Sequence, residues 1–426
     1  MKNDLVVNPY AQIVFKDKYS QWLFDARPDA GYFLKAPVPQ EELKFTGISK
    51  SAQPALYDLF LELAKTEFNA LDVTHDLNAV ERDFLFTAGV LVEKDKAPQK
   101  PLFYCLLDDI EAAEPDVSTA ELIANPSFHF EPFSFNNLVD WINEKHLSPN
   151  QPTAWIERPA SKIKLGWWLS NAQAQIVSNF QAGQKPAIEI EPGLMAKLAA
   201  AEILIQPEKL AEQTREEHEV IARAREDFGR RKYSVLRRLL PPAQMSAMRR
   251  FYRQYVEQGF MPLGDSQVAR RFRQVNEPLA RLFHRSFAGL MSQLAGESVK
   301  PSYVYAASYK EFADLKPHTD RKQCEFSISF QVDYQPETED FLSPWALFIE
   351  RPGFPIDFDK PYSNPNFPAP DEASETNPPI LLASGDALFY KGCEVIRYRY
   401  PLPAGHRLTS FFFHYVPENF ADDLLL

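Results

Sequence analysis

The spacing of hydrophobic residues changes along the chain, and each pattern predicts a different kind of structure. The stretch 51–70 has apolar residues at helical spacing, whereas 84–92 and 102–107 are apolar runs that predict two paired strands. A further strand is expected at 164–170, where two tryptophans are adjacent. Residues 1–205 therefore predict a mixed α/β N-terminal domain of unknown role.

Helical spacing dominates the middle of the chain, at 206–298. Long polar or amphipathic stretches predict helices at 209–228, 241–260 and 275–297. The second has proline in its first turn, and the third closes at Gly296, which are common start and stop signals. We expect these helices to pack against the domain that follows.

Short alternating strands replace the helices at 299–426. Polar turns separate them, which is typical of a sandwich or barrel. A segment with eight prolines, 352–379, interrupts the strands and is long enough to cover the mouth of a barrel. The order of patterns predicts an α+β fold. The expected strands are 302–309, 324–334, 345–350, 379–384, 386–392, 395–400 and 408–416.

Composition argues against several classes of protein. The chain has 426 residues, with 46 Lys and Arg against 58 Asp and Glu, and a formal net charge of −12. An acidic total makes a dedicated nucleic-acid binder an unexpected function. No apolar run has the length of a membrane helix, and the start of the chain does not resemble a secretory signal. Without such a run, we expect no membrane partner. Because its three cysteines are widely spaced, we expect a cytoplasmic protein without a disulfide framework.

One histidine has a setting that suggests chemistry. His318 and Asp320 are two residues apart, so on an extended strand both side chains point to the same face. An imidazole and a carboxylate on one face supply two of the three ligands of the facial triad that holds non-haem Fe(II). A surface histidine beside a capping aspartate is the alternative interpretation of such a pair.

Three segments around this pair resemble a known family. They are YKEFADLKPHTDRKQCEFSISFQVDY, SGDALFYKG and PLPAGHRLTSFFFHYV. Their order resembles the Fe(II)/2-oxoglutarate-dependent dioxygenase superfamily, in its prolyl-hydroxylase-like branch, over roughly residues 230–420. The resemblance implies a double-stranded β-helix (jelly-roll or cupin-like) at 299–426, with supporting helices behind one sheet. It also implies Fe(II) as the metal and 2-oxoglutarate as the co-substrate.

The resemblance assigns roles residue by residue. His318 and Asp320 match the first two metal ligands. Arg407 matches the arginine that binds the distal carboxylate of 2-oxoglutarate, which suits a group that is always charged and can form two parallel hydrogen bonds. Tyr309 matches the tyrosine whose hydroxyl assists that carboxylate. Thr409 shares a face with Arg407 and is a further candidate neighbour of the co-substrate.

The third metal ligand is where this sequence departs from the family. A histidine should stand ten residues before Arg407, and that position is Arg397. A guanidinium has no lone pair and cannot coordinate iron. Either Arg397 swings away from a weakened metal, or another histidine, His406 or His414, takes its place. The third explanation is a metal-free pocket in which Arg397 pairs with Asp320.

Two functions follow from these observations. The first, which the sequence favours, is an oxygenase that hydroxylates a peptide or a small molecule, with the N-terminal domain and the proline-rich loop presenting the substrate. The alternative is a degenerate oxygenase fold that lacks the third ligand and acts as a non-catalytic binding or partner subunit. A basic stretch, 223–285, has fifteen Lys and Arg against five Asp and Glu. It could contact a protein partner or the N-terminal domain, although solvated helix faces explain the same charges.

Overall fold

The contacts in a computed structural model divide the chain into two compact units. Unit 1 comprises Met1–Pro101 and Arg253–Leu263, and unit 2 comprises Leu102–Tyr252 and Gly264–Leu426. Residues 102–205 therefore group with the C-terminal strands. The structure describes residues 5–7, 12–15, 30–36, 44–49, 51, 53–56, 78–87, 91–93, 101–111, 121–132, 151–261, 263–265, 267–339, 341–350, 379–422 and 424.

The described part of unit 1 contains short strands and a helix. Strand β1 pairs with β5, and β3 lies between β2 and β4 in a three-stranded antiparallel sheet. The helix α3 precedes β5. Their bounds are β1 Leu5–Val7, β2 Gln12–Phe15, β3 Ala30–Ala36, β4 Lys44–Ser49, α3 Ala79–Thr87 and β5 Leu91–Glu93.

The predicted pairing of strands at 84–92 and 102–107 is wrong. The first run is helical up to Thr87, and β5 pairs with β1 instead. The second forms only a bridge from Leu106 to Trp168 before a short 3-10 turn, η3 (Leu107–Asp109). Periodicity alone cannot separate a buried strand from other buried segments in so short a run. Most of the predicted helix 51–70 and nearly all of the proline-rich segment lie outside the described residues.

Unit 2 begins with a small layer of strands and short helices. Strand β8 lies between β7 and β9, and β6 pairs with β10. The predicted strand at 164–170 is confirmed as β9, and both of its tryptophans are buried. The bounds are β6 Ile123–Ala124, β7 His129–Glu131, β8 Thr153–Glu157, β9 Lys164–Trp168, α4 Asn171–Val177, α5 Pro192–Ala200 and β10 Leu204–Ile205.

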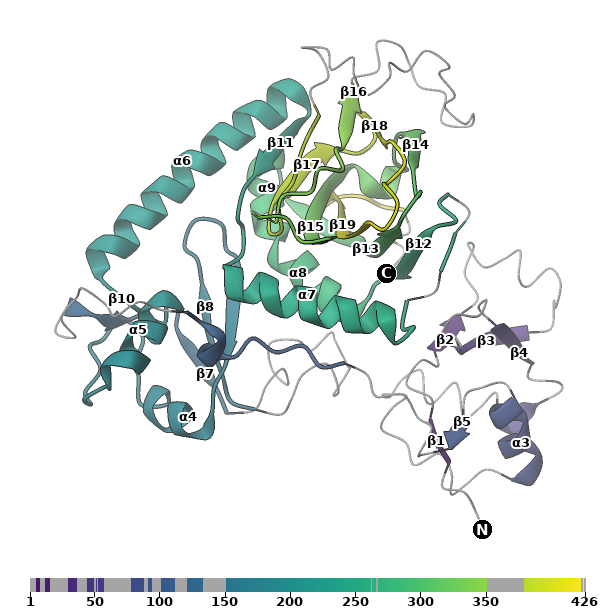
Figure 1. Cartoon of the computed structure of the whole chain (residues 1–426), viewed down its shortest axis with the longest axis horizontal. Helices are drawn as coiled ribbons and strands as arrows, with labels where there is room; N and C mark the ends of the chain where they lie inside the picture. The colour runs from purple at the N-terminus through teal and green to yellow at the C-terminus, as the bar shows by residue number, and fades with distance from the viewer. Residues whose placement is uncertain are drawn as a thin grey trace. The chain divides into compact units, whose positions relative to one another are not determined.

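Four helices confirm the pattern predicted for the middle of the chain (Figure 1). The third predicted stretch is two consecutive helices, the second of which ends at Gly296 with a left-handed φ of 78°. None of the helices in the described ranges combines the length and apolar character that a membrane span requires. The bounds are α6 Pro207–Arg231, α7 Pro242–Glu257, α8 Pro278–Ser286 and α9 Ala288–Ala295.

Two antiparallel sheets form the rest of unit 2. The larger has the strand order β11-β17-β15-β19-β13-β12, and the smaller has the order β14-β18-β16 (Figure 1). All the predicted C-terminal strands are present except 379–384, which forms only isolated bridges. The bounds are β11 Tyr233–Leu236, β12 Arg271–Val275, β13 Val299–Lys310, β14 Leu315–His318, β15 Phe326–Gln335, β16 Phe348–Glu350, β17 Ala387–Lys391, β18 Ile396–Arg399 and β19 Arg407–Pro417, and a 3-10 turn, η5, spans Lys322–Cys324.

The larger sheet buries a different set of side chains on each face. One face packs on the helices: Phe411 contacts Tyr252 of α7, and Phe413 contacts Phe287 between α8 and α9. The other face meets the smaller sheet in a cluster that we call the inter-sheet core. Its members come from both sheets and from the segment before β16. They include Tyr309, Leu315, Trp345, Ile349, Leu388, Tyr390, Leu408 and Phe412. Alternation along β19 thus sends odd-numbered residues to the helices and even-numbered residues to this core.

Gly392 is a position where the fold leaves no room for a side chain. An added Cβ would lie 2.2 Å from the backbone oxygen of Cys324 and 2.7 Å from Oδ2 of Asp320. We expect Gly392→Ala to lower the free energy of unfolding by about 1–3 kcal/mol, because the added methyl group would force backbone atoms to shift. The control is Gly229→Ala inside α6, where no atom would lie within 4 Å of the added Cβ. That variant should gain about 0.5–1 kcal/mol in denaturant titrations. Equal effects at both sites would contradict this packing.

His284 fastens α8 to the larger sheet. It is 2% exposed, its Nε2 donates to the backbone carbonyl of His414 at 2.7 Å, and its ring stacks on Phe413. Burial lowers the pKa of His284 to about 3. Below about pH 6.5 the unfolded chain binds a proton at this histidine, whereas the folded chain does not. The free energy of unfolding therefore falls as the pH drops from about 6.5 towards 3.

We expect His284→Gln to reduce the slope of unfolding free energy against pH in this window, by up to about 1.4 kcal/mol per pH unit. His218→Gln, at an exposed position of α6, is the matched control and should leave the slope unchanged. Denaturant titrations at several pH values measure both slopes. An unaltered slope in His284→Gln would mean that this histidine is not held neutral.

Candidate functional site

His318 and Asp320 lie at the end of β14, beside the inter-sheet core. The register between β14 and β18 places His318 directly opposite Arg397. The backbone N–H of Asp320 donates to the carbonyl of Gly392 at 2.9 Å, which fixes the chain just after the strand. The side chains are 20% and 9% exposed, and His318 Nε2 lies 3.9 Å from Asp320 Oδ1. The predicted pair therefore faces one point, as the alternation of a strand requires.

The hydrogen bonds of His318 fix its tautomer. Its Nδ1 lies 2.7 Å from the backbone carbonyl of Lys316, which can only accept, so Nδ1 carries the proton. Burial, followed by repulsion from Arg397, lowers the pKa of His318 to about 3. The ring is neutral, and the lone pair of Nε2 points towards Arg397. This is the tautomer that a metal ligand needs.

Arg397 takes both of the groups that a metal would bind. Its Nη2 donates to Asp320 Oδ1 and lies 3.3 Å from His318 Nε2. The side chain is 7% exposed, and its guanidinium lies 4.5 Å from the centre of the Tyr390 ring. Burial raises the pKa of Asp320, and the positive charge of Arg397 opposes that effect. The ion pair required by the third explanation, between Arg397 and Asp320, is therefore present.

This donor set does not fit Fe(II) as it stands. A facial triad needs three lone pairs directed at one ion. Here the ligand atoms of His318 and Asp320 already accept hydrogen bonds from Arg397. Arg397 also brings a positive charge to the place that the metal ion would occupy. A metal could enter only after the guanidinium had left.

Tyr309 also faces the inter-sheet core, but its hydroxyl has a different partner from the one the sequence suggests. Arg271 on β12 donates to it through Nη1 at 3.1 Å. The same guanidinium is paired with Asp265 at 2.6 Å and lies 4.8 Å from the Tyr305 ring. Although burial acts to lower it, the pKa of Arg271 is raised by Tyr309, Tyr305 and Asp265. Arg271 was not predicted, because only strand pairing brings β12 beside β13.

The structure does not bring Arg407 and Thr409 together with His318 and Asp320. Arg407 begins β19 and is exposed. Thr409 donates to Ser308 Oγ at 3.0 Å, on the face of β19 that carries Phe411 towards the helices. Their role in holding 2-oxoglutarate stays a prediction.

Two further residues of the inter-sheet core were missed by sequence reasoning. Arg399 follows Arg397 by two positions on β18 and shares its face, a signal that the segment CEVIRYR contains. Its Nη1 donates to the backbone carbonyl of Trp345, and its guanidinium lies 4.5 Å from the Trp345 ring. Burial, opposed in part by Tyr309, lowers the pKa of Arg399 to about 10. Tyr390 on β17 is fully buried below Arg397.

The histidines considered as substitute ligands are hydrogen-bonded to other side chains. His406 is hydrogen-bonded through Nδ1 to the Tyr334 hydroxyl at 2.5 Å. His414 lies near Asp320 and Cys324, and the potential ligand atoms of these three residues lie within 4.8 Å of one another. The His414 ring is hydrogen-bonded to Ser327 at 2.8 Å, and Cys324 Sγ lies 3.1 Å from the Tyr303 hydroxyl. Burial raises the pKa of Cys324, so its thiol stays protonated, and we interpret the cluster as a buried polar network.

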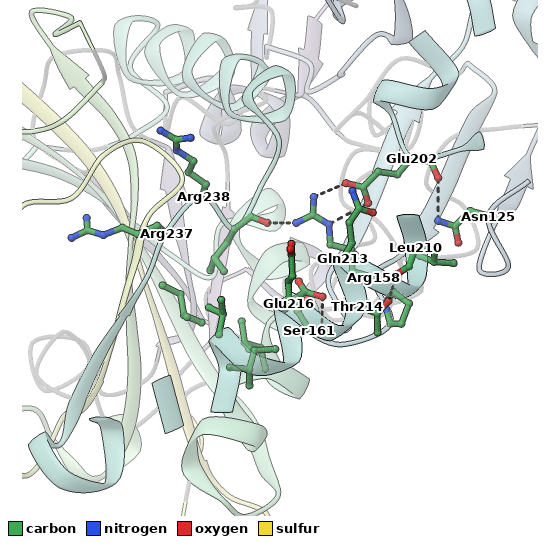
Figure 2. Close-up of a pocket in the computed structure, with 17 residues that line it drawn as sticks. Asn125, Arg158, Ser161, Glu202, Leu210, Gln213, Thr214, Glu216, Arg237 and Arg238 are labelled. Carbon is green, nitrogen blue, oxygen red and sulfur yellow. Dashed lines mark hydrogen bonds and ion pairs between the residues drawn. The ribbon is translucent and has the colours of Figure 1, made fainter. Parts of the chain in front are cut away.

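A separate cavity of about 310 Å³ lies beside α6 (Figure 2). Its charges are largely satisfied within the protein. Arg158 is paired with Glu202 at 2.7 Å and donates to the carbonyl of Leu239, and Glu217 accepts from the backbone N–H of Ser161 at 3.2 Å. The Glu217 contact ties α6 to the turn between β8 and β9. None of the predicted site residues lines it.

Comparisons with known proteins give structural similarity only. No protein-family model matches the chain, and neither does a curated protein sequence. The chain is structurally similar, over about half its length, to Fe(II)/2-oxoglutarate-dependent oxygenases. These structures are of the same class of protein as the one that the sequence resembles.

Three solved structures illustrate this similarity. The non-haem α-ketoglutarate-dependent epimerase SnoN from nogalamycin biosynthesis has a TM-score of 0.34 and 13% identity, covering 48% of this chain and 88% of that one. A Pseudomonas putida prolyl-4-hydroxylase has a TM-score of 0.34 and 14% identity, covering 46% and 98%. HygX from Streptomyces hygroscopicus, with nickel, 2-oxoglutarate and hygromycin B bound, has a TM-score of 0.35 and 14% identity, covering 47% and 88%. SnoN is also described in complex with Fe3+, α-ketoglutarate and nogalamycin RO. The roles of residues in this chain rest on its own geometry.

The buried ion pair predicts strong coupling between its two members. Removing one partner leaves an uncompensated buried charge, so Arg397→Met and Asp320→Leu should each cost about 3–5 kcal/mol of unfolding free energy. The double variant, which removes both charges, should be more stable than either single variant. Denaturant titrations of the four proteins give the coupling energy. Additive losses would show that Arg397 and Asp320 do not interact in solution.

Proposed function

We propose that unit 2 is a metal-independent binding module built on the double-stranded β-helix of the 2-oxoglutarate oxygenases. One observation carries the proposal: Nη2 of Arg397 donates to Asp320 and faces the lone pair of His318. The guanidinium supplies the positive charge that a metal would otherwise supply. In this account His318 and Asp320 hold Arg397 in place and take no part in oxygen chemistry.

The burial of Arg397 supports a permanent arrangement. To leave His318 and Asp320 available to a metal, the guanidinium of Arg397 would have to lose its contact with the Tyr390 ring and its ion pair with Asp320. The β14–β18 register would bring it back opposite His318. Until a metal had bound, Asp320 would be buried without its partner, at a cost of several kcal/mol. These costs favour the ion pair over a weakly held metal.

The second candidate function is the oxygenase that the sequence favours. It is supported by two observations. His318 has the tautomer that an iron ligand needs, and His318 and Asp320 face the same point. Its substrate would be a small molecule or a peptide. This candidate requires Arg397 to move, so metal binding separates the two functions.

A metal titration under anaerobic conditions tests the proposal. The native chain, with Fe(II) and 2-oxoglutarate, should show no visible charge-transfer band and no stoichiometric metal in equilibrium dialysis. Arg397→His supplies the missing lone pair and should bind Fe(II). Bound metal should also raise its midpoint of thermal unfolding.

The control for this titration is the double variant Arg397→His with Asp320→Ala, which again has only two ligands and should lose the metal. A band and one equivalent of Fe(II) in the native chain, both lost in His318→Ala, would contradict the proposal and establish the oxygenase site.

A further inference from the structure

Buried donors without partners gather in the inter-sheet core. The Nε and Nη1 groups of Arg397 and the hydroxyl of Tyr390 are buried and have no hydrogen-bond partner among the residues that the structure describes. Arg397 is 6% exposed and Tyr390 is fully buried. Because the guanidinium lies over the Tyr390 ring, these donors share one neighbourhood. An unsatisfied buried donor is costly, so the core has a specific need for acceptor atoms.

Arg399 adds an unbalanced charge to the same neighbourhood. It is 5% exposed, and its contacts are the backbone carbonyl and ring of Trp345. Within the described ranges, no carboxylate forms an ion pair with it. Arg397 and Arg399 lie two positions apart on the central strand of the smaller sheet and so share one face, on which they contact the rings of Tyr390 and Trp345.

A count of charges shows what is missing. Arg271 is balanced by Asp265 and Arg397 by Asp320. The positive charge of Arg399 is left over in this part of the core. Buried guanidiniums, one of them with unpartnered N–H groups, are the groups that proteins use to hold carboxylates and phosphates, and the Tyr390 hydroxyl adds a further donor.

The geometry points to a binding site for a small oxyanion, a carboxylate or a phosphate, formed by Arg397, Arg399 and Tyr390. This inference rests on the proposed metal-independent function and names the chemistry of its ligand. The ligand's oxygens would accept from the unpartnered donors and balance Arg399. Neighbouring His318 is 20% exposed and marks where the core reaches solvent. The site differs from that of the family resemblance, in which Arg407 receives the acid.

Calorimetry on the full chain tests the inference. Succinate, 2-oxoglutarate and inorganic phosphate are titrated separately in EDTA, with sodium chloride at matched ionic strength as the control. We expect saturable binding of a carboxylate or of phosphate and none of chloride. The comparison of succinate with phosphate shows which oxyanion is preferred, and either preference supports the site.

Two variants locate the bound ion. Tyr390→Phe removes one donor without changing the shape of the core, and should weaken binding about fivefold. Without the ligand it should unfold at a temperature no lower than the native chain, because the lost hydroxyl was unsatisfied. Arg399→Gln should weaken binding by at least about tenfold. Arg230→Gln, an exposed arginine of α6, is the matched control and should bind like the native chain.

Three results overturn parts of this account, and they can be distinguished. No oxyanion binding in EDTA overturns the inference and leaves the metal-independent function standing. Loss of binding in Arg407→Gln with native affinity in Tyr390→Phe places the ion at the other face of β19 and also overturns the inference. Binding that appears only after Fe(II) is added, and is lost in His318→Ala, overturns the proposed function itself.

Discussion

The contact on which the rest of the site depends is the one that Arg397 makes with Asp320 and His318. Strand register creates it, since β18 places Arg397 opposite His318 and Gly392 lets the chain after β14 pass close by. The His318 and Asp320 side chains remain oriented as metal ligands, yet their ligand atoms accept hydrogen bonds from a guanidinium, which cannot itself coordinate a metal. A single residue type at one strand position therefore separates the two functions that this fold could have.

Electrostatics extend the effect of Arg397 across the inter-sheet core. The Arg397–Asp320 pair is balanced in charge, but the guanidinium keeps N–H groups that have no hydrogen-bond partner among the described residues. Arg399 stands two residues away with its guanidinium over the Trp345 ring, and no carboxylate in the described ranges forms an ion pair with it. The core thus carries both unused donors and surplus charge, which together suit an anion better than a second cation.

The sequence predicts the local elements well where the apolar spacing is long and regular, as in α6 and in β13, β15 and β19. It fails at 84–92, where a short run has no distinguishing period. It predicts His318 and Asp320 because alternation on one strand is a local property, and it includes the Arg397–Asp320 pair among its alternatives. It could not reveal Arg271 or Tyr390, because β12 and β17 approach the site only through sheet pairing. The face that β19 turns to the core likewise follows from tertiary packing, and that face determines where Arg407 lies.

The most direct test of the central claim is a crystal structure of the native chain grown anaerobically with Mn(II) and 2-oxoglutarate, with anomalous data collected at the manganese edge. The account predicts no anomalous peak between His318 and Asp320, with Nη2 of Arg397 within hydrogen-bonding distance of both. A peak coordinated by His318 Nε2 and Asp320, with Arg397 turned away, would contradict it.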